Sequence, residues 1–216
     1  MPHIDALGGA PQRLGNARDG SGLRPFRMTN LESLAVAQVE GAYTELSRSG
    51  KLFICGPGVI ANHVAAVTDV PTTASAYSLY NPASSGLVLV VLELFAVLSG
   101  TSGVGGALLY CNPQAEATAV TANTTGVVVK NTLTGDTPTN FFWATGVTLD
   151  IAAAWAVAGV TPHAAVKSGI VSPMPRGGIV VKPGYVFGTH YYTDTGTSPK
   201  AGIGCLVAQY PLDVAA

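Results

Sequence analysis

The sequence predicts an all-β protein, a jelly-roll-like β-sandwich that follows an extended N-terminal arm. The first observation behind this prediction is the C-terminal region, where β-rich runs at 177–182 and 185–192 flank Pro183-Gly184 and a third run covers 201–211. Pro183 presets φ and Gly184 supplies a positive φ, so the chain should reverse between the first two runs. The second observation is a series of short apolar runs, separated by turn-forming residues at intervals of roughly 10–20 residues, which is typical of sandwiches and jelly rolls.

Residues 1–28 are rich in glycine and proline and show no sustained periodicity, which indicates an extended arm that cannot build a core of its own. Two interpretations stay open: a flexible tail, or a tether that orders on a neighbouring molecule. For the tether, the candidate docking residues are the four arginines of the arm, Arg13, Arg18, Arg24 and Arg27. Residues 29–216 are predicted to form a single β-sandwich domain.

The first part of that domain, 29–50, fits two patterns. Thr29 and Glu32 have the spacing of a capping box, and Val39, Tyr43 and nearby apolar residues fall at helical intervals. Val39, Gly41 and Tyr43 also alternate with polar residues, as in a strand. Helix and strand therefore both remain open for this stretch.

The remaining elements are predicted from runs bounded by turn residues. Strands are expected at 51–55, 76–80, 87–99, 107–111, 126–130 and 141–145, and residues 148–160 fit either a short helix or a strand pair. In 201–207 small residues alternate with apolar ones, which predicts a strand with one packed face.

The composition combines ample hydrophobic residues with little charge. Of 216 residues, 48% are hydrophobic, but only 11% are charged, against about 25% in an average protein. A surface so poor in charge predicts that much of it is buried in subunit contacts, and the alternative is a monomer with a Ser/Thr/Asn surface.

Several partner classes are not expected. The net charge is −1, and no Lys or Arg occurs between Leu52 and Val129, which argues against a nucleic-acid partner. The apolar run 87–98 is too short for a membrane span of about 20 residues and contains Glu93. The N-terminus lacks the order of a signal peptide. The three scattered cysteines are expected to be buried thiols of a protein assembled in a reducing compartment.

No catalytic motif, metal site or cofactor site is predicted. The four histidines are isolated and lack the His-x-His pairing that metal-binding sandwiches use, and the glycine-rich stretch 100–106 lacks the Lys-Ser/Thr of a phosphate-binding loop.

Two features could belong to an interaction site. Glu93 is the one polar residue inside the apolar run 87–98 and is expected at an interface, because a lone buried carboxylate is costly. Four aromatic residues could form a ligand platform or an interface patch, with core or intersubunit packing as the alternative. They are Phe141, Phe142, Trp143 and Tyr191.

Taken together, short motifs over residues 35–212 resemble small structural proteins of tailed bacteriophages. The motifs are the stretches 41–45 and 48–53, a terminal hairpin at 179–184, and a turn that leads into the run 87–98. That turn has the sequence Leu79-Tyr80-Asn81-Pro82-Ala83-Ser84-Ser85-Gly86.

The resemblance implies a non-enzymatic capsid decoration or cement protein. Such a protein would be a homotrimer on the outside of the capsid shell, with the major capsid protein as its partner, located in virions that assemble in the bacterial cytoplasm. Two alternatives are a tail, baseplate or fibre module that binds a host-surface glycan, and a cupin-like metal enzyme, against which the missing His-x-His pair argues.

Overall fold

The computed structural model describes residues 27–28, 34–35, 43–99, 106–116, 124–149, 154–161, 170–171, 178–193 and 199–212. The chain divides into two units, Met1–Ala42 and Tyr43–Ala216. In the first unit, β1 (Arg27–Met28) pairs antiparallel with β2 (Leu34–Ala35). All other described elements belong to the second unit.

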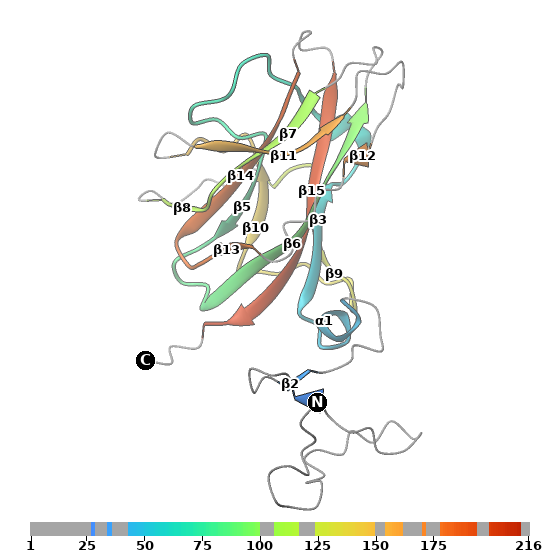
Figure 1. Ribbon diagram of the computed structural model, residues 1–216, viewed down its shortest axis with the longest axis vertical. Coiled ribbons are helices and arrows are strands. Elements are labelled where there is room, and N and C mark those ends of the chain that lie inside the picture. Colours follow the sequence, from blue (N-terminus) through green and yellow to red (C-terminus); the bar gives the residue numbers. More distant parts are fainter. Residues whose placement is uncertain are drawn as a thin grey trace, which may run out of the picture. The chain divides into compact units, whose positions relative to one another are not determined.

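The second unit consists of two antiparallel sheets packed face to face, which confirms the predicted all-β sandwich (Figure 1). The β14 sheet has the strand order β10-β5-β14-β7-β11, with β8 beside β14. The β15 sheet has the order β12-β6-β15-β3-β9, with β13 beside β6 and β4 beside β15.

The strands of the β14 sheet are β5 (Tyr77–Asn81), β7 (Gly106–Cys111), β8 (Gln114–Ala115), β10 (Phe142–Thr145), β11 (Trp155–Thr161) and β14 (Tyr185–Tyr192). The strands of the β15 sheet are β3 (Leu52–Pro57), β4 (Val64–Ala65), β6 (Leu87–Ser99), β9 (Val127–Asn131), β12 (Ile170–Val171), β13 (Ile179–Val181) and β15 (Lys200–Pro211). A short helix, α1 (Thr44–Arg48), precedes β3, and the 3-10 turn η2 (Ile60–Asn62) follows it.

The core lies between the two sheets and is filled by alternate side chains of their strands. Leu94 and Ile203 come from the β15 sheet, and Phe187 comes from the β14 sheet; all three are buried. Phe53 of β3 meets Phe141, next to β10, edge to face with ring centroids 5.1 Å apart. Burial of this apolar surface is the main stabilising term of the sandwich, at about 25 cal/mol per Å².

The predicted Pro-Gly reversal is present between β13 and β14. Gly184 has φ of 76°, and the Tyr185 N–H donates to the Lys182 carbonyl at 3.2 Å. The Gly184 N–H also donates to the Asn81 carbonyl at 2.7 Å, so the turn is fastened to the end of β5. These contacts have the form expected of a turn with glycine at its positive-φ position.

The strands expected from apolar runs are confirmed, with ends that differ by one or two residues. The two stretches for which both helix and strand were considered, 148–160 and 29–50, have different structures. Residues 155–161 form strand β11 rather than a helix, while 44–48 form the five-residue helix α1. The part of 29–50 before Tyr43 is described only at β2.

The three cysteines are free and buried, as predicted. Cys55 and Cys205 lie directly opposite each other on β3 and β15. Burial raises the pKa of the Cys205 and Cys111 thiols, which keeps them protonated and unreactive near neutral pH. In the part of the chain that the structure describes, no helix is long and apolar enough to cross a membrane.

Candidate interaction surface

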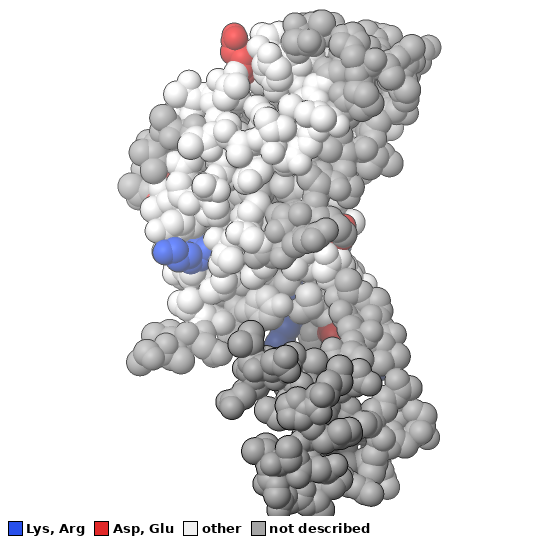
Figure 2. Space-filling model, in the orientation of Figure 1, with Lys and Arg blue, Asp and Glu red and all other residues white. Residues whose placement is uncertain are grey.

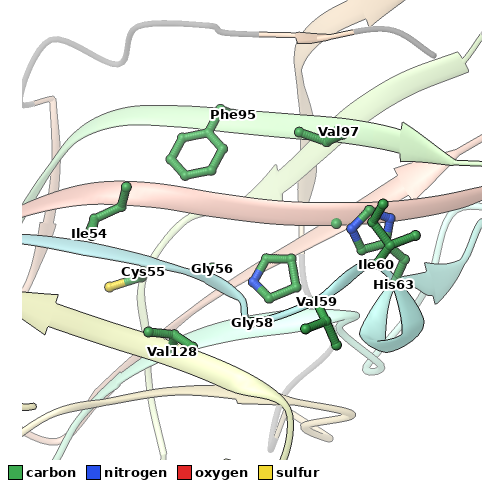
Figure 3. A pocket seen from close by; sticks show the side chains of 12 residues that line it. Ile54, Cys55, Gly56, Gly58, Val59, Ile60, His63, Phe95, Val97 and Val128 are labelled. Atoms are coloured by element: carbon green, nitrogen blue, oxygen red, sulfur yellow. The ribbon is translucent and has the colours of Figure 1, made fainter.

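An apolar groove lies on the outer face of the β15 sheet, the face turned away from the β14 sheet (Figure 3). We call it the outer-face groove. Its volume is about 460 Å³, within the range of about 300–1,000 Å³ usual for binding pockets. Its lining residues are Ile54, Cys55, Gly56, Pro57, Gly58, Val59, Ile60, His63, Phe95, Val97, Val128 and Gly202.

Strand alternation places these side chains on one face. Along β3, Phe53 and Cys55 enter the core, so Ile54 and Gly56 face outward. The register sets Gly56 opposite Val128 of β9. On the far side of β15, Gly204 pairs with Phe95 of β6. Residues from four strands therefore meet in neighbouring rows of the outer face.

Glycines keep the floor of the groove low. A Cβ on Gly204 would lie 2.4 Å from the Phe95 ring and 2.4 Å from the Cys55 carbonyl oxygen. The Phe95 ring therefore lies directly on the backbone of β15 and reaches toward Gly56, where a Cβ would be in ordinary contact at 3.9 Å. Only residues without a side chain allow this close approach of ring and backbone.

The rim beyond β3 is held in place by hydrogen bonds. The Gly58 N–H donates to the Gly126 carbonyl at 2.9 Å, and Asn62 Nδ2 donates to the same carbonyl at 2.8 Å. The Tyr77 hydroxyl donates to the Asn62 carbonyl at 2.8 Å. On this fixed rim Val59 and Ile60 are 60% and 69% exposed. An apolar rim held in this way costs little conformational entropy to bind a partner.

His63 closes one end of the groove. Its Nδ1 lies 2.7 Å from the Ser99 hydroxyl, and its ring covers Gly202, where a Cβ would fall within 2.6 Å of the imidazole. Burial, and to a smaller extent the nearby Lys200 ammonium, lower the pKa of His63. The imidazole is therefore neutral at pH 7 and adds no charge to the groove.

The chemistry of the groove is that of an apolar contact surface. The described residues that line it include no Asp, Glu, Lys or Arg. Figure 2 shows the same scarcity of charge over the described surface of one face of the molecule. Among the described residues, no group of three or more His, Cys, Asp or Glu is placed to hold a metal ion. A surface of this kind suits apolar side chains of a protein partner.

Glu93 lies on the same outer face, next to the groove. It pairs with Leu206 of β15, beside a register shift in the β6–β15 ladder. The Tyr43 hydroxyl donates a hydrogen bond to its carboxylate; burial first, and then this carboxylate, raise the pKa of Tyr43. Tyr43 and Leu46 of the α1 region pack against the cluster of Leu52, Leu92 and Ala208 on this face. Glu93, the polar residue inside the apolar strand, thus has a hydrogen-bond donor in Tyr43.

The four candidate aromatic residues are not gathered on an exposed surface. Phe141, Trp143 and Tyr191 are buried in the core, and Trp143 stacks on Tyr77 with ring centroids 6.0 Å apart. Phe142 is half-buried and packs on the outer face of the β14 sheet. Core packing, the alternative considered for these residues, describes three of the four positions.

The candidate docking arginines are largely outside the described residues. Arg13, Arg18 and Arg24 are not described, and Arg27 lies in β1 without a described side chain. Their role in docking stays a prediction.

Sequence patterns did not predict the outer-face groove. The signals were present in Gly202 and Gly204, in Gly56-Pro57-Gly58, and in strands such as β3 that are apolar on both faces. They became a site only when the register of β15 with β3 and β6 set them side by side.

Comparison of the chain with protein-family models and with curated proteins gave no match. The structural class of the protein therefore comes from the fold alone. It is a two-sheet β-sandwich with an apolar groove on one outer face, and the described lining residues of this groove carry no charge.

Proposed function

We propose that the chain is a non-enzymatic structural protein of a tailed-bacteriophage virion, a homotrimeric decoration or cement protein that binds the outside of the capsid shell. The observation that carries the assembly part is the outer-face groove. Exposed apolar side chains gather there on a chain with only 11% charged residues, and such patches mark protein–protein contacts. The virion part is supported by the sequence resemblance over residues 35–212.

The mechanism would be thermodynamic rather than chemical. A trimer that bridges neighbouring subunits of the major capsid protein binds only the assembled shell, so its binding free energy stabilises the shell against disassembly. Three linked contacts also raise the avidity of each trimer without requiring a strong single contact. The arginines Arg13, Arg18, Arg24 and Arg27 would provide the docking contacts to the capsid protein.

Two measurements test this function. Light scattering behind size exclusion should give about three times the chain mass of 21.9 kDa, and a monomer would contradict the trimer. The full chain should co-sediment with shells of the major capsid protein encoded in the same genome. Failure to co-sediment would contradict the decoration role even if the trimer forms.

A matched pair of variants tests the arginines. Replacement of Arg13, Arg18, Arg24 and Arg27 by Gln should abolish co-sedimentation while the oligomer mass stays the same. The control removes the same number of positive charges elsewhere, at Lys51, Lys130, Lys182 and Lys200. Equal loss in both variants would show that only net charge matters and would contradict docking through the arm.

The glycan-binding alternative has less support. Its candidate platform needs exposed aromatic rings, and three of the four rings are in the core.

A further inference from the structure

We propose that the outer-face groove receives part of the N-terminal segment, residues 1–42, of a second copy of this chain. This inference rests on the proposed homo-oligomer and names the surface and the segment through which it forms. It commits to exchange between copies rather than to closure of the groove within one copy.

The position at which the N-terminal segment joins the sandwich is the first argument. The described sandwich begins at Tyr43, which packs against the cluster of Leu52, Leu92 and Ala208 on the outer face of the β15 sheet. Phe95 of β6, on the same face, lines the groove. The forty-two preceding residues are joined to the sandwich at Tyr43.

The composition of the segment is the second argument. Its second half carries large apolar residues in a stretch too short and too rich in polar residues to form a core, so their burial needs another surface. These residues are Leu23, Phe26, Met28, Leu31, Leu34, Val36 and Val39. The groove offers apolar walls and a glycine floor. Because no carboxylate lines it, the arginines of the segment stay available for the capsid contact.

The reach of the segment is sufficient. At about 3.3 Å per extended residue, forty-two residues span up to about 140 Å, more than a small domain measures. Exchange between copies accounts for two observations with one contact: the groove has exposed apolar side chains, and the chain has only 11% charged residues. Closure within one copy would cover the groove but would leave the scarcity of charge without a role.

Site-specific photo-crosslinking tests the inference on the full chain. A benzophenone amino acid replaces Val128, which lines the groove and is 37% exposed. The matched control is Val180 of β13, on the same face of the same sheet and 45% exposed, but outside the groove. A second groove position, Val97, guards against a local defect at β9. Isotopically heavy and light chains are unfolded together and refolded before irradiation.

The expected result is crosslinking from Val128 and Val97 to peptides within residues 1–42, with heavy–light pairs well represented, and none of these crosslinks from Val180. Heavy–heavy and light–light pairs alone would show closure within one copy and overturn the proposal. Crosslinks to residues 43–216, or no crosslink above the Val180 control, would also overturn it.

The oligomer mass of the same samples separates the two proposals. An oligomer without crosslinks to residues 1–42 removes this inference and leaves the proposed homo-oligomer intact. A monomer removes both.

Discussion

Gly204 is a residue at which the Phe95 ring of the outer face lies directly on the backbone. A methyl group there would overlap the Cys55 carbonyl oxygen, which is backbone, as well as the Phe95 ring. Gly204→Ala should therefore lower the free energy of unfolding by about 1–3 kcal/mol, the usual cost of overpacking. Urea denaturation gives the measurement.

The matched control for this prediction is Gly56→Ala in the neighbouring strand. There the added Cβ would have its nearest contact at 3.8 Å, an ordinary van der Waals distance, and no positive φ is involved. The expected change is within about 0.5 kcal/mol in either direction. Equal destabilisation by both substitutions would show that the groove floor does not depend on close approach at Gly204.

Two histidines should make stability depend on pH. Burial is the main cause that lowers the pKa of both His63 and His190. Their ordinary pKa is about 6.5, so below this pH the unfolded chain binds more protons than the folded chain. The free energy of unfolding therefore falls as the pH drops below about 6.5. Above that pH the contribution of the two histidines to stability is complete.

The substitutions His63→Asn and His190→Asn test this assignment. Asn retains an acceptor near the position of Nδ1, which accepts from the Tyr191 N–H in His190 and meets the Ser99 hydroxyl in His63. Urea midpoints at pH 7.5 and pH 5 should differ less in each variant than in the parent chain. An unchanged difference would assign the pH dependence to other groups.

At the scale of elements, local pattern predicted the strands that have enough residues to show one. β6 and β15 are long, and β13 and β14 are joined by a Pro-Gly turn whose chemistry is visible in the sequence. For β11 the sequence fits a helix as well as strands, because Leu149, Trp155 and Ala156 share a helical face. The contacts that decide for a strand are distant: Trp155 pairs with Cys111 of β7, and Leu149 packs in the same outer cluster. Two-residue strands such as β4 and β8 have no periodicity to detect.

Asn81 connects three strands and should be the least replaceable polar residue of the turn region. Its side-chain Nδ2 donates to the Leu87 carbonyl at 2.8 Å and to the Val181 carbonyl at 2.9 Å, which ties the end of β5 to β6 and β13. Asn81→Ala leaves both carbonyls without this donor and should cost about 2 kcal/mol or more. Thermal and urea unfolding measure the loss. The exposed Asn112 provides the control, since Asn112→Ala should change stability by less than about 0.5 kcal/mol.

At the scale of the whole molecule, composition predicts subunit contacts, which stays a prediction, but it does not show where an apolar groove lies. The scarcity of charge is a property of the entire chain, whereas the groove needs Ile54, Phe95 and Val128 to meet across four strands. That meeting depends on long-range register, which pairs Gly204 with Phe95 on one side and Gly56 with Val128 on the other. Patterns within one strand cannot supply this information.

The two proposed contacts of the molecule should differ in their response to salt: self-association should be insensitive to it, and capsid docking should weaken. Self-association through an apolar groove involves no ion pairs among the described lining residues, so raising NaCl from 0.1 to about 1 M should leave the oligomer mass unchanged. Capsid docking through arginines is electrostatic and should weaken over the same range, because the screening length falls from about 10 Å to about 3 Å. Light scattering reports the first contact and co-sedimentation the second.

Dissociation of the oligomer at high salt would place charged groups in the self-contact and contradict self-association through the outer-face groove. Co-sedimentation that resists salt would contradict docking through the arginines.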